Sequence, residues 1–153
     1  MLEDIFNFVQ LTERVGTSGQ PTEEQFADIA AAGYQAVINL AMPDSDNALA
    51  NEGKLVSAAG MDYLHIPVPW PDPTTEHLRR FFAVMRAYDQ QPVWVHCAMN
   101  LRVSAFMYHY LSRVENRPDS EAISPVIPRW EPQMDDTWRA FLALPTEQLD
   151  ALL

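Results

Sequence analysis

One stretch constrains the fold of this chain more than any other: an apolar run, Val93–His96, that ends at the only cysteine, Cys97, and leads into an apolar segment, Val103–Val114. The run is typical of a buried strand, and the segment is apolar on most sides, as a centrally packed helix is. The first backbone N–H groups of a helix have no partner within it, and the helix dipole favours negative charge there. The junction between strand and helix therefore predicts an anion site with a thiol at its mouth.

The residues around this junction have the chemistry that an anion site requires. Four residues separate Cys97 from Arg102, and the helix N-terminus, the loop amides and the Arg102 guanidinium would all stabilise a Cys97 thiolate. We expect His96 to fix the loop by hydrogen bonds, and the Ser104 hydroxyl to donate to the sulfur. An inert, buried cysteine is the alternative, but the placement at a strand-to-helix junction favours a nucleophile.

Length and composition narrow the functional classes. With 153 residues, the chain is expected to form a single domain over residues 1–153. It has no apolar run long enough to span a membrane and no basic, apolar leader, so we expect neither a membrane partner nor export. A single cysteine fits a cytoplasmic location. The net charge of −11 argues against a nucleic-acid partner.

The remainder of the chain alternates between strand-like and helix-like patterns. Strands are expected at Phe8–Leu11, Arg14–Thr17, Tyr34–Leu40, Met61–Val68 and Val93–His96. Helices are expected at Thr22–Ala32, Ala48–Ala59, Thr74–Tyr88, Val103–Val114 and Asp135–Leu144, with only short helical turns over the proline-rich residues 117–133. This order predicts an α/β domain with a central, mostly parallel sheet of about four to five strands flanked by helices.

A second candidate segment follows the predicted strand Met61–Val68. Proline occupies every second position in the stretch Pro67-Val68-Pro69-Trp70-Pro71-Asp72-Pro73, which predicts a stiff, extended loop. Ligands of parallel sheets bind beyond the carboxyl ends of the strands. Because Asp72 and Cys97 both follow predicted strands, we expect them at the same edge of the sheet.

These residues resemble a known family. His96-Cys97 with Arg102 and Ser104 is similar to the signature loop of the cysteine-dependent protein tyrosine and dual-specificity phosphatases. Trp70-Pro71-Asp72 resembles the mobile loop that carries their general acid. The resemblance extends over about residues 8–143, and the segments Ser18–Pro21 and Val37–Leu40 resemble the opening of small bacterial dual-specificity-like phosphatases.

The resemblance implies a phosphomonoester hydrolase with a phosphatase-like fold. Cys97 would attack phosphorus to form a phosphocysteine, and Asp72 would protonate the leaving oxygen, with Asp62 and Glu76 as reserve acids. Trp70 would either cover the site when its loop closes or serve only in packing. The equatorial phosphate oxygens would be bound by the Arg102 side chain and by the loop amides. The loop residues concerned are Ala98, Met99, Asn100, Leu101, Arg102 and Val103. The implied partner is a phosphorylated protein or a small phosphomonoester.

No cofactor is implied by the resemblance. The histidines His65, His77 and His109 lack metal-ligand spacing with one another or with Cys97, so no metal site is expected.

The sequence departs from the common family pattern at two points of the signature loop, and the 25-residue spacing from Asp72 to Cys97 is also shorter than the family norm. The pattern has five residues between Cys and Arg with Ser or Thr next, whereas here four residues intervene and Val103 separates Arg102 from Ser104. Asn100 stands where the pattern has glycine, and asparagine is the residue best able to replace glycine in a left-handed conformation.

Two other functions stay open. Rhodanese-like sulfurtransferases also have a cysteine loop with four residues before an arginine, although they need no acid, so Trp70-Pro71-Asp72 speaks against them. A non-catalytic protein that binds phosphate esters without turnover is the third possibility, because the shifted Arg102 would then hold the ligand without supporting hydrolysis.

Overall fold

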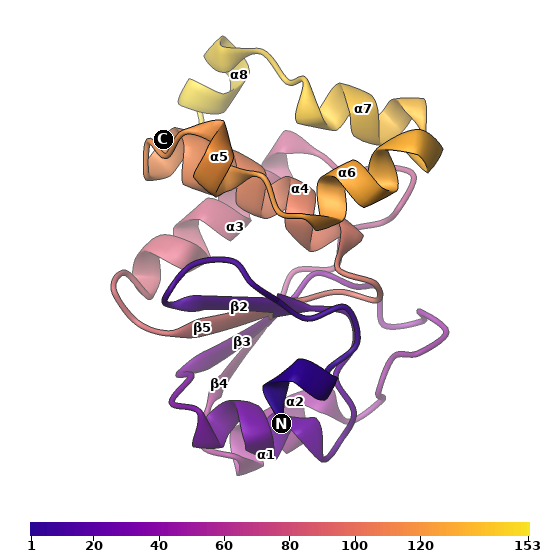
Figure 1. The fold of residues 1–153 in the computed structure, drawn as a ribbon, viewed down its shortest axis with the longest axis vertical. Helices are drawn as coiled ribbons and strands as arrows, with labels where there is room; N and C mark the ends of the chain where they lie inside the picture. The colour runs from indigo at the N-terminus through magenta and orange to yellow at the C-terminus, as the bar shows by residue number, and fades with distance from the viewer.

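The computed structural model describes residues 1–153, and a five-stranded sheet lies at its centre (Figure 1). The strand order is β1-β2-β5-β3-β4; β1 runs antiparallel to β2, and the other neighbours are parallel. The strands are β1 (Val9–Gln10), β2 (Val15–Ser18), β3 (Ala36–Asn39), β4 (Asp62–His65) and β5 (Val93–His96). The predicted α/β class and mostly parallel sheet are confirmed.

Helices cover both faces of this sheet (Figure 1). On one face lie α1 (Gln25–Ala31) and α2 (Glu52–Ala58). On the other lie α3 (Thr75–Ala87), α4 (Leu101–His109) with its π-helical continuation η2 (Tyr110–Val114), α5 (Asp119–Ala122), α6 (Val126–Trp130), α7 (Asp136–Leu142) and α8 (Thr146–Asp150). Two 3₁₀ turns, η1 (Leu2–Asp4) and η3 (Glu131–Gln133), complete the fold. No helix combines the length and the apolar character needed to cross a bilayer.

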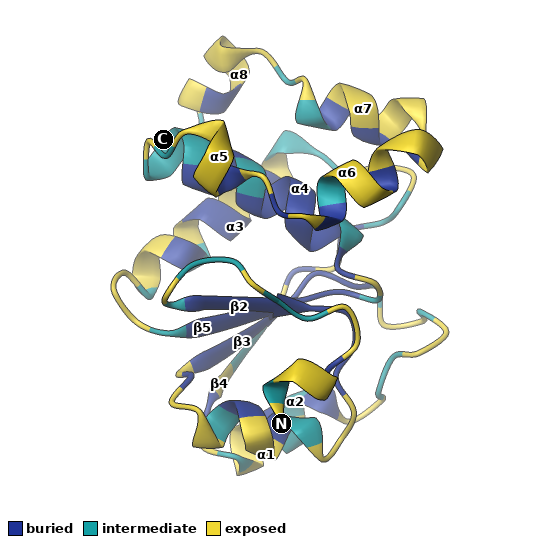
Figure 2. Cartoon of the chain, viewed as in Figure 1, coloured by how far each residue is buried: buried dark blue, intermediate teal, exposed yellow.

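The strands separate two hydrophobic cores, one under each helical layer. In β5, Val93 and Val95 belong to the larger core beneath α3 and α4, whereas Trp94 belongs to the smaller core beneath α1 and α2. This follows from the alternation of side chains along a strand. Figure 2 shows β2, β3 and β5 buried and the outward helix faces exposed. Continued through the end of β5, the alternation directs His96 toward the α1–α2 layer and Cys97 toward α4.

The structure shifts several predicted boundaries. The first helix begins at Gln25 rather than at the predicted Thr22, although the Thr22 N–H donates to the Gln25 side chain at 2.9 Å. Strand β4 ends at His65 because the prolines that follow it cannot donate to a ladder. The Val68 N–H still donates to the Leu40 carbonyl oxygen at 3.0 Å, so the next segment remains attached to the end of β3.

Candidate active site

In the loop between β5 and α4, two carbonyl oxygens accept hydrogen bonds from neighbouring segments of the chain. The Ala98 carbonyl oxygen accepts hydrogen bonds from the Gln20 backbone N–H and the Asn47 side-chain amide, both at 3.1 Å. The Met99 carbonyl oxygen accepts from the Asn7 side-chain amide at 3.1 Å. Three segments that are distant in sequence therefore hold the peptide planes of this loop in one orientation.

The amides of the same loop have no partner. No backbone N–H from Ala98 to Val103 donates a hydrogen bond within the protein, whereas the N–H of Ser104 donates to the Asn100 carbonyl oxygen at 3.1 Å. Consecutive free N–H groups at the start of a helix form a concave donor site for an anion. We refer to residues Cys97–Arg102 with these amides as the anion loop.

A left-handed residue closes the anion loop. Asn100 precedes α4 with φ 72° and ψ 5°, and its side-chain amide donates to the Asn7 carbonyl oxygen at 2.9 Å and to the Thr17 hydroxyl at 3.2 Å. The predicted left-handed conformation is confirmed. Two hydrogen bonds compensate for the cost that a non-glycine residue incurs in this region.

Gly19 lies beside the loop and was not expected to shape it. It forms an isolated antiparallel bridge with Met99, and a Cβ atom at this position would lie 2.7 Å from the Ala98 carbonyl oxygen. Only glycine permits this close approach. In the sequence, Ser18–Pro21 stood out only by its resemblance to a known family, and its contact with Met99 was not evident.

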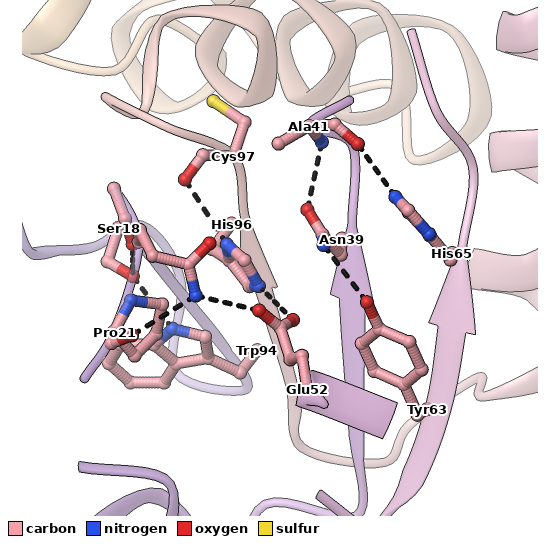
Figure 3. Close-up of polar contacts among 12 residues, drawn as sticks. Ser18, Pro21, Asn39, Ala41, Glu52, Tyr63, His65, Trp94, His96 and Cys97 are labelled. Carbon is pink, nitrogen blue, oxygen red and sulfur yellow. Dashed lines mark hydrogen bonds and ion pairs between the residues drawn. The ribbon is translucent and has the colours of Figure 1, made fainter. Parts of the chain in front are cut away.

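Cys97 occupies the end of β5 and is buried, with 1% of its surface exposed. Its N–H donates to the Ser18 carbonyl oxygen at 3.4 Å, which extends the pairing of β2 with β5. In Figure 3 its sulfur points toward the helical layer above the sheet, away from His96. The thiol thus lies at the base of the anion loop.

Arg102 lies in the first turn of α4 and is also buried, at 6% exposure. Its Nη1 donates to the Val68 carbonyl oxygen at 2.9 Å, and its Cζ lies 5.8 Å from the centre of the Trp70 ring. Its Nε is buried and has no hydrogen-bond partner. A buried, unpartnered guanidinium nitrogen is unusual and marks a place for an acceptor.

The segment that carries Asp72 packs against Arg102 through Trp70. The Trp70 carbonyl oxygen accepts from Trp138 Nε1 at 3.0 Å, and the two indole rings lie 5.1 Å apart. The Asp72 N–H donates to the Pro69 carbonyl oxygen at 3.1 Å in a turn, and the residue is exposed. The Asp72 side chain makes no hydrogen bond within the protein, so the carboxylate is available for a ligand.

His77, the other titratable group close to Asp72, caps α3. Its Nδ1 accepts from the Thr74 N–H at 3.1 Å. Burial and the charge of Arg80 lower the pKa of His77, while the nearby Asp72 and Glu76 carboxylates act in the opposite direction.

The reserve acids have other partners. Asp62 starts β4 and accepts from the Tyr88 hydroxyl at 2.5 Å, and the burial and this contact raise the pKa of Tyr88 to about 12. Glu76 pairs with Arg79 on the exposed side of α3. Because Asp62 begins a strand whose carboxyl end faces the anion loop, it lies at the opposite edge of the sheet.

The expectation for Ser104 is wrong in this structure. Its hydroxyl donates to the Leu101 carbonyl oxygen at 2.6 Å rather than to the sulfur of Cys97. A helical serine commonly bonds the carbonyl oxygen one turn earlier, and Leu101 is three residues before Ser104.

His96 is fixed on the face of the sheet opposite the sulfur. Its Nε2 lies 2.6 Å from Glu52 Oε2, and its Nδ1 lies 3.2 Å from the Cys97 carbonyl oxygen (Figure 3). Burial alone would raise the pKa of Glu52, but the hydrogen bond and charge of His96, followed by Gln20 and Tyr63, hold it below its ordinary value. Glu52 was not identified from the sequence, because an acid in the first turn of a helix usually faces solvent.

Two small cavities lie in this part of the structure, and one of them is lined by residues of the anion loop. One of about 190 Å³ lies beside the exposed Met99 side chain and is bordered by Trp130 and Arg129. Another of about 170 Å³ lies beside Glu52 and Tyr63. No three side chains of the metal-ligating types converge anywhere in the structure.

A larger cavity of about 840 Å³ lies at the opposite edge of the sheet. Its basic groups are largely paired: Arg14 and Arg117 both contact Glu115, at 3.3 and 2.8 Å. Its lining contains no cysteine, so the anion loop remains the candidate site.

Comparisons with known proteins agree with this geometry. A family profile described as a DSP-PTPase phosphatase fused to NAD+ kinase matches residues 7–136. A solved candidate phosphatase (DUF442) from Shewanella putrefaciens CN-32 is 35% identical, with a TM-score of 0.84 over 98% of this chain and 92% of that chain. TpbA from P. aeruginosa, solved in complex with phosphotyrosine, shares the fold at 16% identity, with a TM-score of 0.69 over 96% of this chain and 88% of its own.

A curated relative is a beta-lactamase hydrolase-like protein of Agrobacterium fabrum (strain C58 / ATCC 33970). The two are 37% identical over 93 residues, which are 58% of this chain and 21% of the relative. The matched region thus spans about a fifth of that protein's length.

Proposed function

Because this chain belongs to the family described as a DSP-PTPase phosphatase fused to NAD+ kinase, we propose that it hydrolyses phosphomonoesters through a phosphocysteine on Cys97. The observation that carries the proposal is the coincidence of free amides and an unpartnered Arg102 Nε around one buried thiol. These donors suit a dianionic group with several oxygens.

In the first half of the proposed reaction, the Cys97 thiolate attacks phosphorus. The S–P bond forms while the P–O bond to the leaving group breaks, and Asp72 transfers its proton to the departing oxygen. The equatorial oxygens accept hydrogen bonds from the loop amides and from Arg102, where charge is spread in the transition state.

In the second half, Asp72 acts as a base. It takes a proton from a water molecule, whose oxygen attacks phosphorus as the S–P bond breaks. Inorganic phosphate leaves, and the Cys97 thiolate and the protonated Asp72 are regenerated. A thiolate nucleophile requires a reduced sulfur, so a reducing compartment such as the cytoplasm suits this reaction.

The proposed substrate is a phosphorylated protein or a small phosphomonoester. Met99, on the loop itself, has 49% of its surface exposed, and the Trp130 ring borders the adjacent cavity. An apolar rim of this kind favours a leaving group with an apolar face, such as an aryl group. Phosphotyrosine, bound in the TpbA structure, has that chemistry.

One observation favours a second candidate function, sulfur transfer. Only four residues separate Cys97 from Arg102, as in rhodanese-like proteins. In that reaction the thiolate would take the outer sulfur of thiosulfate, releasing sulfite and forming a persulfide, which cyanide would then remove as thiocyanate. Asp72 would have no role in it.

The test is turnover of an aryl phosphate across pH by the wild type and Cys97→Ser, with vanadate as a phosphate-like inhibitor. We expect vanadate-sensitive hydrolysis by the wild type and none by Cys97→Ser. Full activity in Cys97→Ser contradicts the proposal. Thiosulfate-to-cyanide transfer without hydrolysis selects the second candidate, and phosphate-ester binding without either reaction selects a non-catalytic binder.

A further inference from the structure

A buried acid lies beneath the anion loop and has no role in the reaction described above. Glu52, at the start of α2, is 4% exposed, and His96 is fully buried. Glu52 Oε2 lies 2.6 Å from His96 Nε2, and its Oε1 accepts from the Gln20 side-chain amide at 2.7 Å (Figure 3). Both carboxylate oxygens are therefore engaged.

The hydrogen bonds of His96 fix how many protons this pair holds. The Cys97 carbonyl oxygen only accepts hydrogen bonds, so Nδ1, at 3.2 Å, carries a proton. The contact of Nε2 with Glu52 requires a second proton between them. Gln20 donates to the other carboxylate oxygen, so both oxygens of Glu52 are arranged as acceptors. Both ring nitrogens of His96 therefore lie against acceptor oxygens, which is the arrangement of an imidazolium paired with a carboxylate.

Stability alone does not account for such a pair. Removing two charges from water costs several kcal/mol, and apolar residues of similar volume commonly stabilise a fold as well as a buried ion pair does, or better. The pair instead places a positive charge on the residue next to the nucleophile. Its Nδ1–H also holds the Cys97 carbonyl oxygen, which fixes the first peptide plane of the anion loop.

We propose that Glu52 is a positioning residue that keeps His96 doubly protonated, so that the imidazolium stabilises the Cys97 thiolate and orients the start of the anion loop. The use made of the thiolate rests on the proposed phosphatase function, but the effect on thiol ionisation does not. Without the carboxylate, His96 loses the partner that holds its second proton.

The other groups around the pair leave this role to Glu52. The Tyr63 hydroxyl of β4 faces Glu52, and burial raises the pKa of Tyr63 to about 12, so it stays neutral. Gln20, between β2 and α1, is uncharged, and Phe26 of α1 packs near His96 with ring centres 6.2 Å apart. Arg102 of α4 lies across the loop with Cys97 and is common to all variants below.

The experiment follows the alkylation of Cys97 by iodoacetamide as a function of pH. Cys97 is the only cysteine, so the label reports one thiol, and vanadate protection verifies that it reacts at the loop. The variants are Glu52→Gln and Glu52→Asp, and Glu115→Gln is the matched control. Glu115 is a part-buried, ion-paired glutamate at the opposite edge of the sheet. Histidine ring ¹⁵N spectra of the wild type give a second measurement that needs no variant.

We expect Glu52→Gln to react about tenfold more slowly near neutral pH, with its alkylation profile moved to higher pH, and Glu52→Asp to recover part of the rate. Glu115→Gln should match the wild type. His96 should show two protonated ring nitrogens at neutral pH. Identical profiles for wild type and Glu52→Gln, or a singly protonated His96, overturn the proposal. An inactive wild type that still shows the Glu52 effect contradicts the phosphatase function alone.

Discussion

Arg102 Nη1 donates a hydrogen bond to the Val68 carbonyl oxygen at 2.9 Å, and this contact joins the loop after β5 to the segment after β4. The guanidinium lies over Trp70 at the same time, while its buried Nε has no partner. One residue thus connects the anion loop with the segment carrying Asp72 and keeps one donor without a partner in the protein. The four-residue spacing is compatible with a phosphate site because α4 begins at Leu101, which brings Arg102 into its first turn.

Arg102→Lys should lower kcat/KM for an aryl phosphate by about 10²–10³, because lysine lacks the planar fork that bonds Val68 and a phosphate oxygen together. Steady-state kinetics measures this. Arg113→Lys is the matched control, since Arg113 donates only to the Thr146 hydroxyl at 2.9 Å. Wild-type kcat/KM in Arg102→Lys would show that the guanidinium does not bind the transferred group.

Asp72→Asn should reduce the hydrolysis of alkyl phosphates at neutral pH by about 10²–10⁴, the range typical of a lost general acid. For an aryl phosphate with a good leaving group, the rate of phosphocysteine formation should fall less, because the departing oxygen needs little protonation. The comparison of the two substrates, with Glu76→Gln as control, is the measurement. Equal losses for both substrates at that step would remove Asp72 from the acid role.

Trp138→Phe should loosen the segment around Trp70, because it removes the hydrogen bond from Nε1 to the Trp70 carbonyl oxygen and keeps an aromatic ring. We expect a several-fold lower kcat with KM little changed, since Arg102 still contacts Val68. Trp130→Phe loses a similar volume against the same Trp70 ring, 5.7 Å away, but no hydrogen bond, so its kcat separates lost packing from the lost hydrogen bond. If the two variants have the same kcat, the Trp138 hydrogen bond does not position the acid segment.

Glu52 should make stability depend on pH. Its pKa in the fold lies below the ordinary value of 4.5, so its stabilising contribution is complete above that value and is lost as the pH falls through the lowered pKa. The free energy of unfolding in urea, measured for wild type and Glu52→Gln between about pH 6 and about pH 3, should therefore converge toward acid pH. A difference that stays constant over this range would contradict the ion pair.

Much of the fold follows from local patterns. The strand Val93–His96 is observed with its predicted ends, because a short apolar run bounded by Pro92 and a polar loop has few alternatives. The cysteine, the arginine and the left-handed asparagine were recognisable because each residue type carries its own chemistry. The candidate anion site was therefore predictable as a position in the chain.

The supporting contacts were not predictable, since they join distant segments through atoms that leave no pattern. Glu52 lies 44 positions from His96, and Asn7 lies 92 positions from Met99. The partner of Arg102 is a backbone oxygen, which any residue supplies. Ser104 has the expected spacing from Cys97, but its hydroxyl rotates to a nearer acceptor within the helix.

Trapping the intermediate tests the central claim most directly. Asp72→Asn should slow the hydrolysis of a phosphocysteine more than its formation from a good aryl phosphate, so the intermediate should accumulate. Intact-protein mass spectrometry after rapid quenching should then show one added phosphoryl group, located on Cys97 by peptide mapping and missing from the Cys97→Ser, Asp72→Asn double variant. Phosphate release by Asp72→Asn without any phosphorylated Cys97, or equal labelling of the double variant, would contradict the account.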